Sequence, residues 1–232
     1  MPNSTVYQDG TYLSQNRTWH AEDSRWKAAN VGLMLGRNGI AASTICEVGC
    51  GAGGILECLA EDYGPDVTFS GYEISPQAFE LCHPKERQNL RFFLKDALDA
   101  QEAFFDVVLA MDVLEHVEDY LGFLRKLRAR GTFKVFHIPL DLSVQMVLRS
   151  TPIMRARASV GHLHYFTKET ALATLTHAGY RVLDSFYTSP MELPHRGWRR
   201  GVLRGPRTVL FSVNRDLTVR VLGGFSLMVL AT

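Results

Sequence analysis

The chain has 232 residues, which is enough for one α/β domain with insertions. Apolar residues make up 46% of it, so a full hydrophobic core can form and global disorder is excluded. No apolar run is long enough to span a membrane, and residues 1–10 lack the basic and apolar segments of a secretory signal, so we expect a cytoplasmic location. The four cysteines match no zinc spacing and are expected to be reduced thiols.

The formal net charge of +1 conceals two parts of opposite charge. Residues 1–142 contain 13 Lys and Arg against 20 Asp and Glu, a net charge of −7. Residues 143–232 contain 12 against 4, a net charge of +8. The basic second part favours an anionic substrate or partner.

The first predicted element follows a polar and aromatic segment, residues 1–28. This segment either covers a pocket as a lid, through Trp19, His20 and Trp26, or is pinned to the core by its tryptophans. Apolar periodicity and flanking Gly or Pro predict helices at 26–39, 53–64, 76–84 and 117–130. Short apolar runs predict strands at 43–50, 67–75, 90–98, 104–116 and 131–140. Continuous apolar strands that alternate with helices indicate a parallel sheet covered on both faces.

The pattern changes after residue 140. Residues 141–166 have mixed character and include an amphipathic surface segment that Pro152 prevents from forming a single helix. Thr167 is the expected cap of a helix over 167–179, which precedes a strand at 180–188. An Arg-rich connection then leads to a last apolar strand at 224–232. We therefore expect one domain over 29–232, with insertions at about 140–160 and 191–207.

A glycine-rich stretch lies where the 43–50 strand gives way to a helix. Its glycines are Gly49, Gly51, Gly53 and Gly54. Glycine lets a ligand lie against the main chain, and the helix start offers unpaired N–H groups. The stretch fits both G-x-G-x-x-G and G-x-G-x-G, and either match alone is weak. Glu73 ends the next strand, where a carboxylate accepts ribose hydroxyls and repels a 2′-phosphate, so NADP is disfavoured and NAD stays open.

With these elements in order, the chain resembles class I S-adenosylmethionine-dependent methyltransferases of the kind related to ubiquinone-biosynthesis O-methyltransferases. The resemblance covers roughly residues 40–232. Its markers are 47–53, 71–75, 95–98, 105–119, 137–139, 161–180 and 223–232. It implies a Rossmann-like, seven-stranded, mostly parallel sheet with helices on both faces and an antiparallel last strand.

The resemblance also implies cofactor-binding roles for residues at the strand ends. Those expected at the methionine end of S-adenosylmethionine are Glu47, Gly49, Cys50, Gly51 and Gly53. Glu73 and Ile74 are expected at the ribose, and Asp96 and Ala97 at the adenine. Met111, Asp112 and Val113 are expected beside the sulfonium. Two simpler interpretations stay open: Asp96 as a helix cap, and Asp112 or Glu115 as the cap of the following helix.

Three histidines are candidates for a catalytic base: His116, His162 and His164. The last two alternate on an expected strand and would share one face. Each histidine has a purely structural alternative. No metal site is expected, because the histidines do not cluster with acids at ligand spacing along the chain.

The function expected from these observations is methyl transfer from S-adenosylmethionine, leaving S-adenosylhomocysteine, to a small-molecule or carrier-linked acceptor at oxygen. The alternatives are a non-catalytic cofactor-binding module and an NAD-linked oxidoreductase. The charge of the second part favours an anionic, lipid-linked or sugar-linked acceptor. The Arg-rich stretch 195–207, with Trp198, is either a solvated loop or a contact for phosphate or a membrane surface. Nucleic acid is not expected, because basic and aromatic residues are not interleaved.

Overall fold

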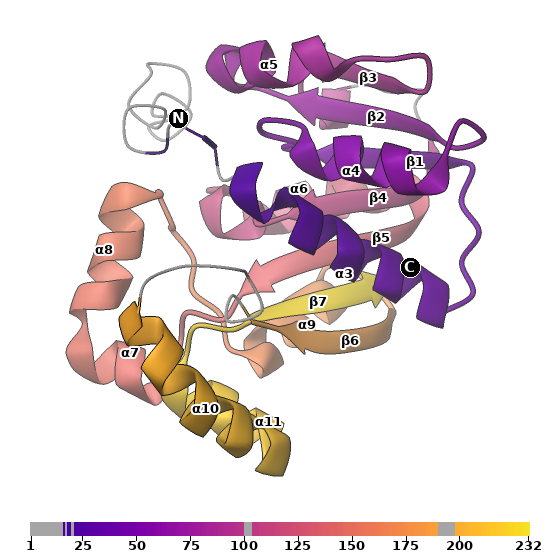
Figure 1. The fold of residues 1–232 in the computed structure, drawn as a ribbon. Helices are drawn as coiled ribbons and strands as arrows, with labels where there is room; N and C mark the ends of the chain where they lie inside the picture. Colours follow the sequence, from indigo (N-terminus) through magenta and orange to yellow (C-terminus); the bar gives the residue numbers. More distant parts are fainter. Residues whose placement is uncertain (1–15, 17, 20, 100–103, 190–197) are drawn as a thin grey trace.

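The computed structural model describes residues 16, 18–19, 21–99, 104–189 and 198–232. Its centre is a seven-stranded sheet in the order β3-β2-β1-β4-β5-β7-β6 (Figure 1). The strands are β1 Thr44–Val48, β2 Thr68–Glu73, β3 Leu90–Leu94, β4 Phe105–Met111, β5 Gly131–Pro139, β6 Val182–Thr188 and β7 Ser226–Ala231. Strand β7 is antiparallel to both of its neighbours, and the other pairings are parallel. The predicted sheet, with its antiparallel last strand, is confirmed.

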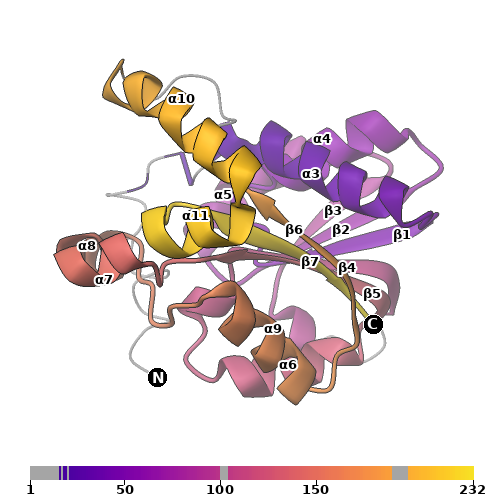
Figure 2. The same cartoon turned by 90° about the horizontal axis from the view of Figure 1, so that it is seen from below.

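Helices cover both faces of the sheet (Figure 2). One face carries α3 Ser24–Arg37, α4 Gly54–Tyr63 and α5 Pro76–Cys82. The other carries α6 Tyr120–Arg128 and α9 Lys168–His177. The remaining α-helices are α7 Val144–Arg149, α8 Thr151–Ser159, α10 Trp198–Val213 and α11 Arg215–Leu222. Short 3₁₀ helices lie at η1 Ala21–Asp23, η2 His83–Lys85, η3 Ala97–Asp99 and η4 Leu114–His116.

The strands are apolar on both faces, which explains why they read as continuous hydrophobic runs. In β4, Val107 and Leu109 face the α3–α4 side, whereas Val108 and Ala110 face the α6–α9 side. All four side chains are fully buried. This two-sided burial is typical of a mostly parallel sheet between helical layers.

Local signals set several helix starts as predicted. Pro76 occupies the first turn of α5, and the Ser75 hydroxyl accepts from the N–H of Ala78. Thr167 caps α9 in a reciprocal capping box with Thr170. Pro152 lies in the first turn of α8, so residues 144–159 form two helices instead of one.

Two expectations are wrong. The Arg-rich connection is helical from Trp198 and continues through Pro206 to Val213, followed at once by α11. Residues 161–167 form no strand, so His162 and His164 do not share a strand face. Residues 195–197 of the Arg-rich stretch, and His20, lie outside the described residues.

Helices α7, α8, α10 and α11 form a group beside β5, β6 and β7 (Figures 1 and 2). The side chain of Gln145 on α7 donates to the carbonyl of Leu222 on α11, with an N–O distance of 2.6 Å. None of the helices among the described residues has the length and hydrophobicity needed to cross a lipid bilayer.

Candidate functional site

A cavity of about 630 Å³ opens at the carboxyl ends of the parallel strands. Its walls include residues that directly follow or end β1, β2, β4 and β5. Strands β2 and β3 lie on one side of β1, and β4 and β5 lie on the other. The direction in which successive strands are added to the sheet therefore reverses between β1 and β4. Open α/β sheets bind ligands in this position, because the loops after the two central strands diverge.

The glycine stretch forms a tight turn between β1 and α4. Gly51 has a φ of +54°, and a Cβ atom added there would lie 2.7 Å from Cδ1 of Trp19. Gly53 has a φ of +73°, and a Cβ there would lie 2.6 Å from Cζ of Phe92. Both positions therefore require glycine for its left-handed backbone and for close approach. Gly51 lines the cavity, whereas Gly53 faces the packing behind it.

Glu73 holds this turn in place from the end of β2. One carboxylate oxygen accepts from the N–H of Gly51 at 2.8 Å. The other accepts from the N–H groups of Ile74 and Ser75, each at 2.8 Å. Burial raises the pKa of Glu73, and the three backbone hydrogen bonds oppose that shift. Glu73 and Ile74 both line the cavity, as predicted residues of the site.

Glu47 is buried below the glycine turn, and one of its carboxylate oxygens lacks a hydrogen bond within the described part of the chain. Its side chain is 1% exposed, and its Oε2 atom has no hydrogen-bond partner among the described residues. Burial raises the pKa of Glu47 well above its ordinary value, and the charge of Lys27 offsets only part of this. A buried acceptor on a cavity wall is suited to a donor group on a ligand.

We expect Glu47→Gln to stabilise the ligand-free protein at neutral pH. Because the pKa of Glu47 is higher in the folded chain than in the unfolded chain, the free energy of unfolding falls as the pH rises above about 4.3, the ordinary pKa of glutamate. Glutamine removes this penalty. We expect a gain of about 1–3 kcal/mol in unfolding free energy at pH 7.5, and little at pH 4, by urea denaturation.

The matched control is Glu80→Gln, on the exposed surface of α5. It should leave the unfolding free energy unchanged at both pH values. A lower stability of Glu47→Gln at pH 7.5 would contradict the assignment of a strained, unpartnered carboxylate.

Asp112 is the centre of a charged network directly after β4. Its φ of +56° turns the carboxylate back toward α3 and β5. Its two oxygens lie 2.6 Å from Nζ of Lys27 and 2.5 Å from Nδ1 of His137. The other ring nitrogen of His137 lies 2.8 Å from the Thr188 hydroxyl. Burial alone would raise the pKa of Asp112, but His137 and Lys27 hold it far below its ordinary value.

The cavity is strongly acidic. Six carboxyl groups line it, against Lys27 as its only lysine or arginine within the described residues. They belong to Asp23, Glu47, Glu73, Asp112, Glu115 and Glu118. Because Lys27 is paired with Asp112, the excess negative charge favours a cationic ligand.

Two tryptophans of the N-terminal segment border the same cavity. Trp19 lies over the backbone of Gly51, and Trp26 on α3 contacts His137 edge-on, with ring centroids 5.9 Å apart. Both line the cavity. The lid interpretation of residues 1–28 stays a prediction, because residues 1–15 and His20 lie outside the described residues.

Some of the remaining residues that are predicted to bind the cofactor line the cavity, and others do not. Gly49, Cys50, Met111 and Val113 line the cavity. Asp96 and Ala97 are not among the lining residues. Asp96 is exposed, and its carboxylate accepts from the N–H of Leu98 at 2.8 Å. This contact is the cap expected in the simpler interpretation of Asp96, and the adenine contact stays a prediction.

Two of the three candidate histidines line the cavity, and the third does not. His116 and His162 line the cavity, with ring centroids 5.0 Å apart. Nδ1 of His162 lies 2.7 Å from a carboxylate oxygen of Asp141. His164 does not line the cavity; its Nε2 lies 3.0 Å from the carbonyl oxygen of Val117.

Glu115 lies beside the first two histidines and is fully buried. Burial raises its pKa well above the ordinary value, and the charge of Asp112 adds to the shift. No sequence pattern points to Lys27 or His137, which the fold brings to Asp112. His137 belongs to one of the recognised markers, residues 137–139, but nothing in the pattern assigned it a partner.

Comparisons with known proteins agree with this geometry. A family model described as "Methyltransferase domain" matches residues 19–185. A ubiquinone biosynthesis O-methyltransferase of Methylocella silvestris is 41% identical over 86 residues, which cover 35% of this chain and 32% of that protein. A 2-methyl-6-phytyl-1,4-hydroquinone methyltransferase of Synechocystis is 38% identical over 91 residues, 37% of this chain and 27% of that protein.

The matched stretches thus span 32% and 27% of the length of these two relatives. Among solved structures, a magnesium protoporphyrin IX methyltransferase of Synechocystis with bound SAH superposes with a TM-score of 0.66. The alignment covers 99% of this chain and 98% of that one at 14% identity, which establishes a shared fold.

Proposed function

This chain belongs to the methyltransferase-domain family, and we propose that it transfers a methyl group from S-adenosylmethionine to an acceptor oxygen. The observation that carries the proposal is the acidic cavity above the glycine turn. The cofactor is a cation at both its sulfonium and its ammonium group. A cavity with six carboxyl groups and one paired lysine suits that charge.

Individual residues fit the cofactor. Oε2 of buried Glu47 has no hydrogen-bond partner among the described residues, which supports Glu47 as the acceptor for the ammonium at the methionine end. Trp19 fills the space that a side chain at Gly51 would take, so the backbone of the turn and Trp19 together form the wall against which we expect the cofactor to lie. Glu73 keeps the turn in position through three backbone hydrogen bonds and retains lone pairs for the ribose hydroxyls.

The chemistry requires little from the protein beyond placement. S-adenosylmethionine supplies a methyl group already activated by the sulfonium. Alignment of the acceptor with that methyl contributes on the order of 7–11 kcal/mol. The Asp112 network fixes the wall after β4 by joining α3, β4 and β5. An oxygen acceptor must also lose a proton, and His116 and His162 are the candidate residues on that side of the cavity.

Oxygen as the acceptor atom is supported by the similarity to the ubiquinone biosynthesis O-methyltransferase of Methylocella silvestris. We propose an acceptor with an anionic or carrier-linked part. The cavity is acidic, so that part is expected to lie outside it, toward the basic helices. Arg149, Arg155 and Arg157 on α7 and α8 are exposed and have no ion pair among the described residues.

A paired titration tests this function. S-adenosylhomocysteine and NADH are added separately to the full chain in a calorimeter. We expect saturable 1:1 binding of the first and none of the second. Binding of NADH alone would overturn the proposal in favour of an oxidoreductase. Cofactor binding without methyl transfer across a panel of phenols, catechols, sugars and their lipid-linked forms would favour the non-catalytic module.

We further propose that the basic helices contact an anionic membrane surface. Half or more of each of four apolar side chains on α7 and α10 is exposed, and Arg149 directly follows two of them in the chain. They are Val147, Leu148, Val209 and Val213. Exposed apolar side chains interspersed with arginines are typical of helices that lie in the membrane interface.

Vesicle co-sedimentation tests this contact. We expect the chain to bind vesicles that contain anionic phospholipid, to release at high salt, and to ignore vesicles of phosphatidylcholine alone. The double variant R155E/R157E should lower vesicle affinity at least tenfold, at about 1 kcal/mol for each basic residue lost. The control is Arg181→Glu. Arg181 is exposed and lies directly before the first residue of β6. Equal vesicle affinity of R155E/R157E and Arg181→Glu would contradict the proposed membrane contact. The basic helices would then be expected to meet a soluble anionic acceptor.

A further inference from the structure

One positive side chain lies among the acids of the cavity. Lys27 on α3 is the only lysine or arginine that lines the cavity within the described residues. Its Nζ atom lies 2.6 Å from Oδ2 of Asp112, and only 14% of its side chain is exposed. Burial alone would lower the pKa of Lys27, but the charge of Asp112 and their hydrogen bond raise it. The ammonium therefore stays charged at neutral pH.

Asp112 carries the negative charge that this ammonium balances. Burial opposes its ionisation, but His137 and Lys27 keep the pKa of Asp112 below its ordinary value. A neutral His137 ring meets both of its contacts, because Nδ1 donates to Asp112 and Nε2 accepts from the Thr188 hydroxyl at 2.8 Å. Lys27 is therefore the partner that is charged at neutral pH whatever the protonation state of the ring.

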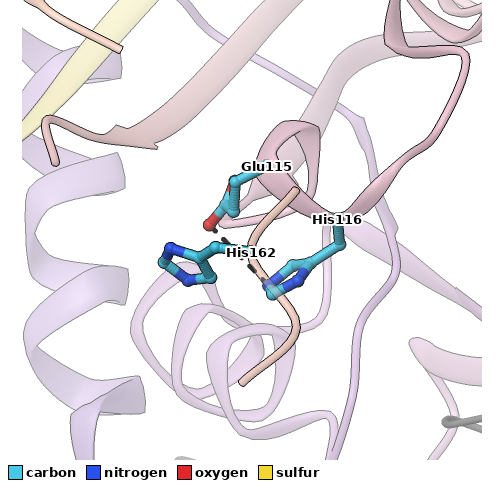
Figure 3. A group of neighbouring side chains, drawn as sticks. All are labelled: Glu115, His116 and His162. Carbon is cyan, nitrogen blue, oxygen red and sulfur yellow. Dashed lines mark ion pairs between the residues drawn. The ribbon is translucent and has the colours of Figure 1, made fainter. Parts of the chain in front are cut away.

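Two other buried carboxyl groups of the cavity differ from Asp112. Burial raises the pKa of both Glu47 and Glu115 well above the ordinary value. Glu115 points toward the rings of His116 and His162 (Figure 3), and its Oε1 is 3.8 Å from Nε2 of His116. Asp112 is thus the buried carboxylate of the cavity whose charge is balanced by an ion pair with a lysine.

The ion pair lies beside the place where a ligand on the glycine turn is expected. Strands β1 and β4 are neighbours, so the residues after β4 face the turn that follows β1. A Cβ atom added to Gly49 would lie 3.1 Å from Cγ2 of Val113, the residue after Asp112. A ligand held between the turn and this wall therefore has Asp112 and Lys27 beside it.

This placement matters because a charge changes during the proposed reaction, on which the inference rests. A C–O bond forms to the acceptor, the C–S bond breaks, and its electron pair stays on sulfur, so the sulfonium becomes a neutral thioether. The acceptor hydroxyl releases its proton. An unbalanced carboxylate beside the sulfur would stabilise the substrate more than the transition state, in which the positive charge is already declining, and so would raise the barrier.

We propose that Lys27 sets the relative affinity of the site for S-adenosylmethionine and S-adenosylhomocysteine by balancing the charge of Asp112. With the lysine in place, the wall beside the sulfur has little net charge, and it discriminates little between sulfonium and thioether. Without the lysine, the carboxylate attracts the sulfonium and favours S-adenosylmethionine. Lys27 is thus a specificity-determining residue that α3 supplies from outside the recognised markers.

Calorimetric titration of the full chain with each compound tests the proposal. The quantity measured is the selectivity ratio, the dissociation constant of S-adenosylhomocysteine divided by that of S-adenosylmethionine. Lys27→Gln, whose amide is still a donor for Asp112, should raise this ratio by about fivefold or more. Asp112→Asn should lower it by about fivefold or more, because an unbalanced ammonium then repels the sulfonium. The double variant should return to within about twofold of the wild type.

The matched control is Lys126→Gln, on the exposed side of α6, which should leave the selectivity ratio unchanged. Lys27→Met is a second variant, which removes both the charge and the donor and should raise the ratio as Lys27→Gln does. Thermal unfolding of each variant without ligand verifies that it is folded. A purely structural role of Lys27 would weaken binding of both compounds equally, and a ratio unchanged in both Lys27 variants would overturn the proposal.

Two outcomes separate this inference from the proposed function. If the wild type binds both compounds and the selectivity ratio is the same in Lys27→Gln as in Lys126→Gln, the role of Lys27 is refuted and the proposed function stands. If the wild type binds neither compound, the proposed function and the role of Lys27 are refuted together.

Discussion

Glu73→Gln is expected to weaken S-adenosylhomocysteine binding by tenfold or more, by calorimetry. The carboxylate accepts three backbone N–H groups, from Gly51, Ile74 and Ser75. An amide replaces one acceptor oxygen with a donor, so at least one N–H loses its partner and the glycine turn loosens. Hydrogen bonds to a charged group contribute about 1.5–3 kcal/mol, which is roughly 10–150-fold in affinity.

Glu80→Gln, on exposed α5, is the matched control and should bind as the wild type does. The same substitution at Glu73 should also lower the free energy of unfolding without ligand, because the turn is held by these contacts. If affinity falls while ligand-free stability is unchanged, Glu73 acts mainly through the ribose. Unchanged affinity would refute a role for Glu73 in the cofactor site.

Asp112→Asn is expected to lower the free energy of unfolding by about 2–3 kcal/mol. It leaves Lys27, whose side chain is 14% exposed, without its counter-charge. Removal of one partner from a fully buried ion pair costs about 3–5 kcal/mol, and Asp112 is 27% exposed, so the effect should be smaller. Asparagine tolerates the positive φ at this position, so the change tests charge and not backbone strain.

The pH dependence of this effect has a defined sign. The pKa of Asp112 is held below its ordinary value, so its contribution to stability is present above about pH 4 and declines as the pH falls further. The difference between wild type and Asp112→Asn should therefore be largest near pH 7 and shrink below pH 4. Urea denaturation at several pH values measures it.

A double-mutant cycle with Lys27→Met isolates the pair. The double variant should be more stable than the sum of the two single changes predicts, by at least about 1 kcal/mol. Asp66→Asn, an exposed aspartate before β2, is the control and should have no effect. An additive cycle would mean that the Lys27–Asp112 contact contributes nothing to the fold.

The sheet could be predicted because its signals are local. Buried parallel strands are continuous apolar runs, and Ser75–Pro76 and Thr167 mark helix starts by their own chemistry. Family membership, inferred from markers spread over the chain, is confirmed by the match over residues 19–185. The cofactor half of the site follows from the same signals, since the glycine turn and Glu73 lie at strand ends.

The rest depends on contacts that no local pattern encodes. Lys27 reaches Asp112 only because α3 packs across the sheet. His162 reaches Glu115 only because the segment after α8 is bonded to η4. Helix α10 lies where the sequence predicts an Arg-rich connection, yet the chain is helical through Pro206. Its packing against α11 supplies a context that local propensity lacks.

The position of β7 has a consequence for how the molecule assembles. Strand β6 joins the sheet only through β7, which pairs with β5 from Lys134 to Pro139. Strands β1 to β5 are successive in the chain, so the glycine turn and its partners can form from contacts that are available early in synthesis. Ser226, at the start of β7, borders the cavity beside Pro139. The cavity wall beside β5 and β7 should therefore form last, and slow pairing of distant strands should limit the rate at which newly made protein folds completely.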